Sequence, residues 1–237
     1  MTKYKQISDK VHEITISNRK GKKSRWININ NAKKEEIEFL RKKYKFDLNE
    51  LKLSFANYSS QRTRLQQNEK YIFLILHFPV INGYSVKAAE ILFFVTKTDL
   101  ITIHDNDLDS FNEFFSLAKK DGSGLLTNEL TYPEILLYEI LNKLILASYD
   151  ILDENSLALH KIESIIFDDE QGKAVSEILH LKRNIINMRK MMQNHKNIFK
   201  RLMVMQNNKT IEKQLKENYL HLIEHSKTFW EILDSEK

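Results

Sequence analysis

The segment LHLKRNIINMRKMM, residues 179–192, lies within the most regular hydrophobic pattern of the chain. Apolar residues recur there at alternating steps of three and four, which defines a heptad seam and predicts one long helix. The seam consists of Ile178, Leu181, Ile185, Met188, Met192, His195, Phe199 and Leu202. An isolated helix of this kind is only marginally stable, so the seam predicts packing against other helices or other subunits. His195 is its polar member, and we expect it to make a buried or rim hydrogen bond rather than a metal bond.

Two further helices are expected on either side of this one. Thr131, Pro133 and Glu134 combine a capping hydroxyl, a first-turn proline and the acid of a capping box, and the apolar pattern then predicts a helix to about Phe167. The acidic segment 168–172, DDEQG, predicts the tip of a hairpin. A last helix is expected from about Thr210. Its seam is Ile211, Leu215, Tyr219, Leu222, Ser226, Phe229 and Leu233.

Residues 1–122 show a mixed α/β pattern. Strands are predicted for VHEITI (11–16), RWINI (25–29), TRLQQN (63–68), KYIFLILHFP (70–79, ended by Pro79), AEILFFVTK (89–97) and LITIHD (100–105), with a tight turn at Thr98-Asp99. Helices are predicted for AKKEEIEFLRKKY (32–44, capped by Asn31), DLNELKLSFAN (47–57, capped by Asp47) and DSFNEFFSLAKK (109–120). The composition changes at DGSG, residues 121–124, so we expect an α/β subdomain, 1–122, and a long-helix subdomain, 123–237.

Composition limits the class of protein. The 237 residues include no cysteine, which excludes disulfides and thiolate metal sites and fits a reducing compartment. No signal peptide and no apolar run of bilayer length is visible, so the chain as given is expected to be soluble. The net charge of +5 is spread out, and its densest basic run is residues 19–25, RKGKKSR. We interpret this run as a loop between strands rather than a nucleic-acid site, because no aromatic residues interleave with the charges.

No enzyme motif stands out. The chain has neither a phosphate-binding glycine loop nor a nucleophile elbow, so we expect no catalysis. One candidate metal site remains, in which Glu217, His221 and His225 lie four residues apart on one stripe of the last helix. Two imidazoles and a carboxylate suit a borderline ion such as Zn²⁺. The alternative is a solvated polar face, and the spacing alone favours that alternative.

Several segments, in order, carry a family resemblance. They include WINI (26–29), QRTR (61–64), where Thr63 replaces a usual proline, and AEILFFVTKTDLITIHD (89–105). The strongest is LHLKRNIINMRKMM itself, with its Leu-Lys-Arg-Asn and Met-Arg-Lys spacing. On these residues the chain resembles the cytoplasmic domain of the CorA family of divalent-cation transporters over nearly its whole length.

The resemblance implies an α+β fold, an α/β/α sandwich with a mixed sheet followed by a long helical hairpin and a stalk helix. It also implies a homopentamer at the cytoplasmic face of the inner membrane, whose stalk continues into transmembrane spans and a Gly-Met-Asn motif. Lys237 would then be a cut, or a natural truncation, of a longer transporter. The implied activity is passive uptake of Mg²⁺, Co²⁺ or Zn²⁺, with Mg²⁺ bound between domains closing the pore.

The chain departs from the family pattern at the regulatory metal site. The family's two carboxylate positions fall at about Ser54 or Phe55 and at about Leu220, none of which is acidic. Nearby acids that could substitute are Asp47, Glu50, Glu217 and Glu224. A further departure is Asn194, which replaces a proline of the family's second long helix. These differences keep two alternatives open: a zinc-type transporter domain, and a soluble sensor or scaffold without a pore.

Overall fold

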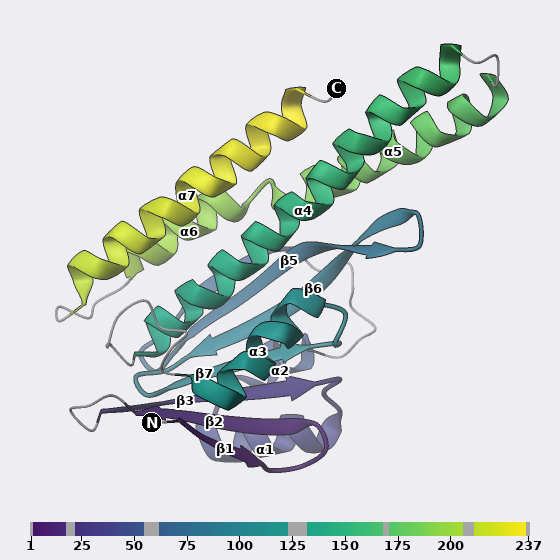
Figure 1. Ribbon diagram of the computed structural model, residues 1–237. Helices are drawn as coiled ribbons and strands as arrows, with labels where there is room; N and C mark the ends of the chain where they lie inside the picture. Colours follow the sequence, from purple (N-terminus) through teal and green to yellow (C-terminus); the bar gives the residue numbers. More distant parts are fainter. Residues whose placement is uncertain are drawn as a thin grey trace.

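A computed structural model describes residues 2–17, 22–54, 62–122, 132–167, 171–205 and 211–235. Figure 1 shows one twisted sheet with helices on both faces and long helices that extend beyond it. The strands are β1 (Thr2–Gln6), β2 (Val11–Ser17), β3 (Lys23–Asn30), β4 (Arg64–Gln67), β5 (Ile72–Asn82), β6 (Ser85–Val95) and β7 (Asp99–His104). The helices are α1 (Lys34–Tyr44), α2 (Leu48–Lys52), α3 (Asp109–Asp121), α4 (Pro133–Phe167), α5 (Gln171–Met192), α6 (His195–Met205) and α7 (Glu212–Ser235).

The sheet is mixed and lies between two helical layers. Its order is β1-β2-β3-β7-β6-β5-β4, and only the central β3–β7 pair is parallel. Alternate side chains of the central strands enter separate cores, with Trp26 facing α3 and α4 and Ile27 facing α1 and α2. Because both faces are covered, every residue of β7 is buried. The expected α+β fold, a sandwich with a mixed sheet and long helices, is confirmed.

A chain of buried hydrogen bonds joins the two central strands. Trp26 Nε1 donates to Thr102 Oγ1 at 3.0 Å, and Thr102 Oγ1 donates to Asn28 Oδ1 at 2.7 Å. The same Asn28 oxygen lies 3.1 Å from His104 Nε2, while the Asn106 amide donates to His104 Nδ1 at 3.1 Å. These partners fix the neutral tautomer with the proton on Nε2. Burial lowers the pKa of His104 to about 3, so the imidazole stays uncharged.

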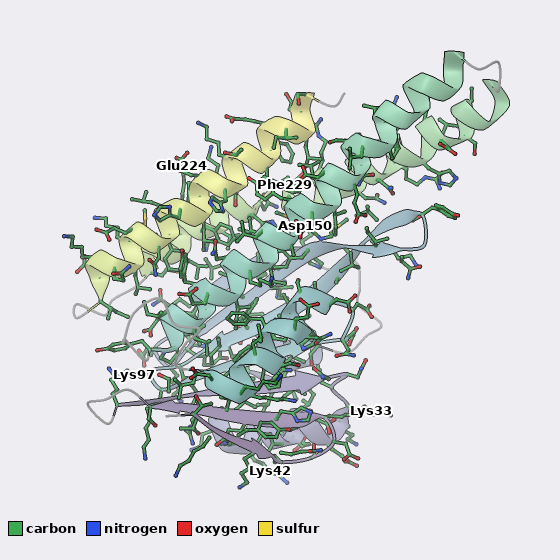
Figure 2. The ribbon with its side chains drawn as sticks, viewed as in Figure 1. Lys33, Lys42, Lys97, Asp150, Glu224 and Phe229 are labelled. Carbon is green, nitrogen blue, oxygen red and sulfur yellow. The ribbon has the colours of Figure 1, made fainter. Side chains whose placement is uncertain are left out.

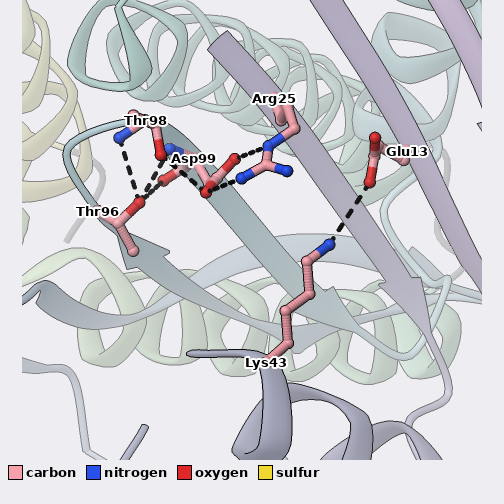
Figure 3. A network of polar contacts seen from close by, with 6 residues as sticks. All are labelled: Glu13, Arg25, Lys43, Thr96, Thr98 and Asp99. Atoms are coloured by element: carbon pink, nitrogen blue, oxygen red, sulfur yellow. Dashed lines mark hydrogen bonds and ion pairs between the residues drawn. The ribbon is translucent and has the colours of Figure 1, made fainter. Parts of the chain in front are cut away.

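An ion pair marks the edge where β3 and β7 begin (Figure 3). Arg25 donates from Nε and, at 2.8 Å, from Nη2 to the carboxylate of buried Asp99, which also accepts from Thr98 Oγ1 at 2.9 Å. The hydrogen bonds to Asp99 raise the pKa of Arg25. Nearby, Lys43 lies 3.6 Å from Glu13. A turn before β7 is confirmed, although Asp99 already belongs to the strand. The Arg25–Asp99 pair ties the start of β7 to β3, and the separate Lys43–Glu13 pair joins α1 to β2.

The helical layer confirms both predicted seams. Every residue of the last seam is buried, from Ile211 just before α7 to Leu233, whereas on the other seam Ile178 is exposed and Ile185 is half-buried. α4 runs from Pro133 to Phe167, as its start signal and apolar pattern predict. Thr131 lies outside the described residues, as do 168–170 of the expected acidic tip and 19–21 of the basic run.

The Leu-Lys-Arg-Asn motif has a structural role that its spacing did not show. Asn184 on α5 accepts from the Val86 amide at 2.9 Å and donates to the Tyr84 carbonyl at 3.2 Å. It also donates to Asn155 Oδ1 on α4 at 3.2 Å. One buried amide therefore fastens the helical hairpin to the start of β6.

The expected single helix through residue 202 is wrong, because the structure divides it into α5 and α6. The Gln193 amide still bonds to the Arg189 carbonyl, but the ladder then restarts with Ile198 bonded to Asn194. The seam stays buried across this break, so its periodicity gives no warning. The expected burial of His195 is confirmed. Neither ring nitrogen makes a hydrogen bond of normal geometry in the described part of the chain, but the backbone of Met192 and Met191 acts on the ring and raises its pKa against the larger effect of burial.

Three smaller expectations need correction. Pro79 does not end β5, which continues to Asn82; β4 pairs only as far as Ile75, so the proline lies beyond the paired part of that edge, where its missing N–H is tolerated. Lys33, not Asn31, is the N-cap of α1, and its amide donates to the Glu36 carboxylate at 2.8 Å. β1 was missed because its mostly exposed residues, TKYKQ, lack apolar alternation.

The predicted division after residue 122 falls at Gly122, where a described segment ends. Residues from both sides of that point, such as Trp26 and Leu137, belong to one hydrophobic cluster. The two subdomains therefore share a core, and the division itself stays a prediction.

Candidate metal-sensing surface

The outer face of α7 carries the candidate metal ligands. In Figure 2, Glu224 lies on the outer side of α7 and Phe229 on the side toward α4. The Phe229 ring contacts Tyr149 edge-on, with centroids 5.2 Å apart. Burial of the apolar seam against α4 and α6 thus leaves the polar face of α7 toward solvent.

The three predicted ligands on this face differ in exposure. Glu217 and His221 are exposed, whereas His225 is half-buried. The Nδ1 atom of His225 is buried without a hydrogen-bond partner in the described residues, and Tyr149 donates to the His225 carbonyl at 2.6 Å. Nε2 is therefore the nitrogen of His225 that remains for a ligand. The described segments contain no group of three or more His, Asp or Glu residues arranged to hold a metal, so this site stays a prediction.

The two family carboxylate positions are structurally unlike each other. Ser54 is buried at the end of α2 and donates to the Leu51 carbonyl at 2.7 Å, whereas Leu220 is 49% exposed on α7. Phe55 lies outside the described residues. Neither described side chain offers an ionic oxygen, so a metal sensor of the expected kind needs other ligands.

Acidic residues that the sequence reasoning missed lie beside Ser54. A cavity of about 90 Å³ there is lined by Glu90, Asp105 and Asp107, among others. Burial, and then the negative charges of Asp107 and Glu90, raise the pKa of Asp105. Glu90 also lies 3.0 Å from His77 Nε2. The sequence signal for these acidic residues is the segment HDND, which stands at the end of the buried strand β7. Side chains at the ends of strands come together at one edge of a sheet.

Two of the proposed substitute acids already have structural partners. Asp47 caps α2, as predicted, by accepting from the amides of Asn49 at 2.8 Å and Glu50 at 3.2 Å. Glu50 accepts from the Tyr71 hydroxyl at 2.6 Å. Burial raises the pKa of Glu50, and burial with this hydrogen bond raises that of Tyr71 to about 12. Glu217 and Glu224 are consequently the more available carboxylates.

None of the helices in the described segments combines the length and apolar character needed to cross a membrane. What the geometry defines is a three-layer α+β domain that continues into a helical hairpin and an amphipathic helix, α7, with a polar outer face.

Several solved structures share this fold. The soluble domain of CorA from Methanocaldococcus jannaschii aligns with a TM-score of 0.70 and 19% identity, covering 90% of this chain and 85% of that one. The complete CorA magnesium transporter of the same organism aligns with a TM-score of 0.72 and 19% identity, covering 93% and 69%. The ZntB cytoplasmic domain from Vibrio parahaemolyticus gives 0.56 and 14%, covering 89% and 84%.

The comparison of the sequence with family models identifies the family of this chain. Residues 21–237 match the family described as CorA-like Mg²⁺ transporter protein, whereas no curated protein matches the chain. The chain belongs to the CorA-like Mg²⁺ transporter family. The expected resemblance is thereby confirmed, and the expected function is confirmed to the level of a CorA-like transporter's soluble domain.

Proposed function

We propose that this chain senses Mg²⁺ or a related divalent cation and gates passive cation flux through a homopentameric pore at the cytoplasmic face of the inner membrane. The observation that carries the proposal is the family match, which spans the sheet, the helical hairpin and α7 together. Uptake needs no coupled energy source, because a divalent ion gains about 2.3 kcal/mol per charge for each 100 mV of membrane potential.

The exposed face of α7 supports a role for this helix in sensing. Glu217 and Glu224 are two turns apart and exposed, so a neighbouring subunit can approach both carboxylates. Mg²⁺ keeps several waters and binds through one or two carboxylates, which suits a ligand set completed across a subunit interface. A cation that binds one packing of the interface more tightly than another shifts the equilibrium toward that packing.

Sedimentation velocity of residues 1–237 tests interfacial sensing directly. The domain alone is expected to be monomeric or weakly oligomeric, and Mg²⁺ is expected to shift it toward larger species. The double variant Glu217→Gln/Glu224→Gln should lose this shift, whereas Glu113→Gln, an exposed acid on α3, should keep it. An unchanged profile of the wild-type chain up to about 20 mM Mg²⁺ contradicts the proposal.

A zinc-type transporter domain is the second candidate. The observation that favours it is the pair His221 and His225 on α7, since imidazole suits Zn²⁺ better than Mg²⁺. Calorimetric titration with each cation separates the two candidates. Tight Zn²⁺ binding that needs His221 supports the zinc type, and Mg²⁺ binding that needs the α7 carboxylates supports the magnesium type.

A further inference from the structure

The turn between β5 and β6 projects beyond the other strands of the sheet, beside α5 (Figure 1). Asn82 and Ser85 form the last pair of this hairpin, so Gly83 and Tyr84 are its two loop residues. Gly83 has a φ of 62°, and Tyr84 is not among the described residues with positive φ. This combination is typical of a type II′ turn, which takes glycine at its first central position.

This turn contains the one Asn-Gly pair of the chain, and both residues are exposed. A Cβ atom added at Gly83 would meet no other atom within 4 Å, so the backbone there is not crowded. Within the described residues, neither the Asn82 side chain nor the Gly83 amide makes a hydrogen bond. The fold therefore leaves both groups free to move toward each other.

An asparagine side chain and the next backbone amide can react with each other. The amide nitrogen loses its proton to solvent and attacks the side-chain Cγ, so that a new N–C bond forms. The bond from Cγ to the side-chain nitrogen breaks, and that nitrogen takes a proton from solvent and leaves as ammonia. Water then opens the resulting succinimide ring, which gives either aspartate or isoaspartate. Glycine as the second residue favours the attack because it has no Cβ to block the approach.

We propose that Asn82 is a site of spontaneous modification, at which the folded protein converts its side-chain amide to aspartate and isoaspartate. Water and its ions are the only co-reactants. The attack requires rotation of the Asn82 backbone and opening of the pair with Ser85, and the tips of hairpins open at little cost in free energy. The site is independent of the proposed cation transport, because the reaction uses only residues of this turn.

Asn155 provides an internal control, because a small residue, Ser156, also follows it. Asn155 lies inside α4 and is only 7% exposed. Its Nδ2 donates to the Ile151 carbonyl at 2.8 Å, and its Oδ1 accepts from Asn184 at 3.2 Å. The helical backbone and these two bonds hold its side chain away from the next amide, so we expect Asn155 to stay intact in the folded protein.

Conversion at Asn82 alters the contact between the hairpin and α5. Asn184 donates to the Tyr84 carbonyl at 3.2 Å and accepts from the Val86 amide at 2.9 Å, so it holds the hairpin just after the turn. Isoaspartate adds one methylene to the backbone, which changes the shape of the turn and the register of the pair with Ser85. Aspartate changes only the charge of an exposed side chain. The isoaspartate form should therefore hold the hairpin to α5 less firmly.

Peptide mapping by mass spectrometry tests the proposal. The folded chain is incubated at neutral and at mildly alkaline pH, beside the same chain unfolded in guanidinium chloride. In the folded chain we expect Asn82 to gain the mass of an amide-to-acid exchange at a rate within about tenfold of that in the unfolded chain, because the turn opens readily. The rate should be higher at alkaline pH, where the backbone amide loses its proton more easily. A carboxyl methyltransferase specific for isoaspartate then labels that product.

Two variants at one position separate the chemistry from its consequence. Asn82→Gln should abolish the conversion and the methyl label at this turn, because the longer side chain closes the ring far less readily. Asn82→Asp supplies the charge without the extra methylene, so the aged wild-type chain should unfold at a lower denaturant concentration than this variant. An Asn82 that stays intact in the folded chain while the unfolded chain converts it overturns the site. An isoaspartate-containing chain as stable as Asn82→Asp overturns the weakened contact with α5.

Discussion

Arg189 on α5 donates a hydrogen bond to the Asp234 carboxylate on α7, with 2.9 Å between Nη2 and Oδ1. The same guanidinium lies over the Trp230 ring. Arg189 therefore braces the last turns of α7, the helix that we propose to sense cations, against the helical hairpin.

The brace predicts unequal effects for its two partners. Asp234→Asn should cost less than about 1 kcal/mol of unfolding free energy, because the carboxylate is half exposed and the pair is screened. Arg189→Ala should cost more, since it also removes the contact with the indole ring. Chemical denaturation measures both values. Equal costs would show that the indole contact contributes nothing.

The Asn184 contacts predict a large structural effect. Asn184→Ala should lower the unfolding free energy by about 2–3 kcal/mol, because it leaves the Val86 amide and the Asn155 side chain without this partner in a buried region. Asn187, which makes one half-buried bond to the Val86 carbonyl at 3.1 Å, is the matched control. Its alanine variant should cost under about 1 kcal/mol in the same urea titration. Similar costs for both variants would contradict the fastening role of Asn184.

His195 predicts a pH dependence of stability. Burial lowers its pKa from 6.5 to about 4, so between these values the unfolded state binds more protons than the folded state. Stability is therefore lost as the pH falls from 6.5 toward 4, by about 3 kcal/mol in total from this residue. Above pH 6.5 the imidazole is neutral in both states and contributes no pH dependence.

The variant His195→Met isolates this effect. It should be as stable as the wild type at pH 7 or more so, because an apolar side chain replaces two unpaired buried nitrogens. Its unfolding free energy should fall less steeply between pH 6.5 and 4, with the buried His104 still contributing. His180→Met, an exposed control on α5, should keep the wild-type slope. An identical slope for His195→Met would show that His195 does not titrate as described.

The histidine stripe predicts zinc binding that depends on one exposed side chain. If the stripe binds Zn²⁺ as predicted, His221→Ala should weaken that binding about tenfold or more in calorimetry, because it removes one of the three candidate ligands. His180→Ala controls for adventitious binding by exposed imidazoles. Superimposable isotherms for the wild type and His221→Ala would remove the stripe as a metal site.

Sequence reasoning recovered the features that depend on local periodicity. The seams through Met188 and Leu222 predicted which faces of the long helices are buried, and the alternation in residues 11–16 predicted β2. It failed where a tertiary contact decides the outcome. The break after Met192 leaves the seam intact, and Pro79 is tolerated because of an unpaired strand edge that no local pattern reports.

The candidate site shows the same contrast between local sequence patterns and tertiary contacts. Helical spacing alone placed Glu217, His221 and His225 on one stripe, but it could not show that Tyr149 packs against His225 and leaves only one nitrogen available. The carboxylates near Ser54 come from β6 and from the loop after β7, so only the folded sheet brings them together.

The central claim is that the chain gates divalent-cation flux, and proteoliposomes test it most directly. The complete polypeptide that the gene encodes is reconstituted, and Mg²⁺ entry is followed with an internal fluorescent indicator under an imposed membrane potential. Our account predicts potential-driven entry that falls as Mg²⁺ rises on the side of this domain, with weaker inhibition in Glu217→Gln/Glu224→Gln. Entry no faster than in protein-free liposomes would contradict the account and leave a relative of the family without a pore.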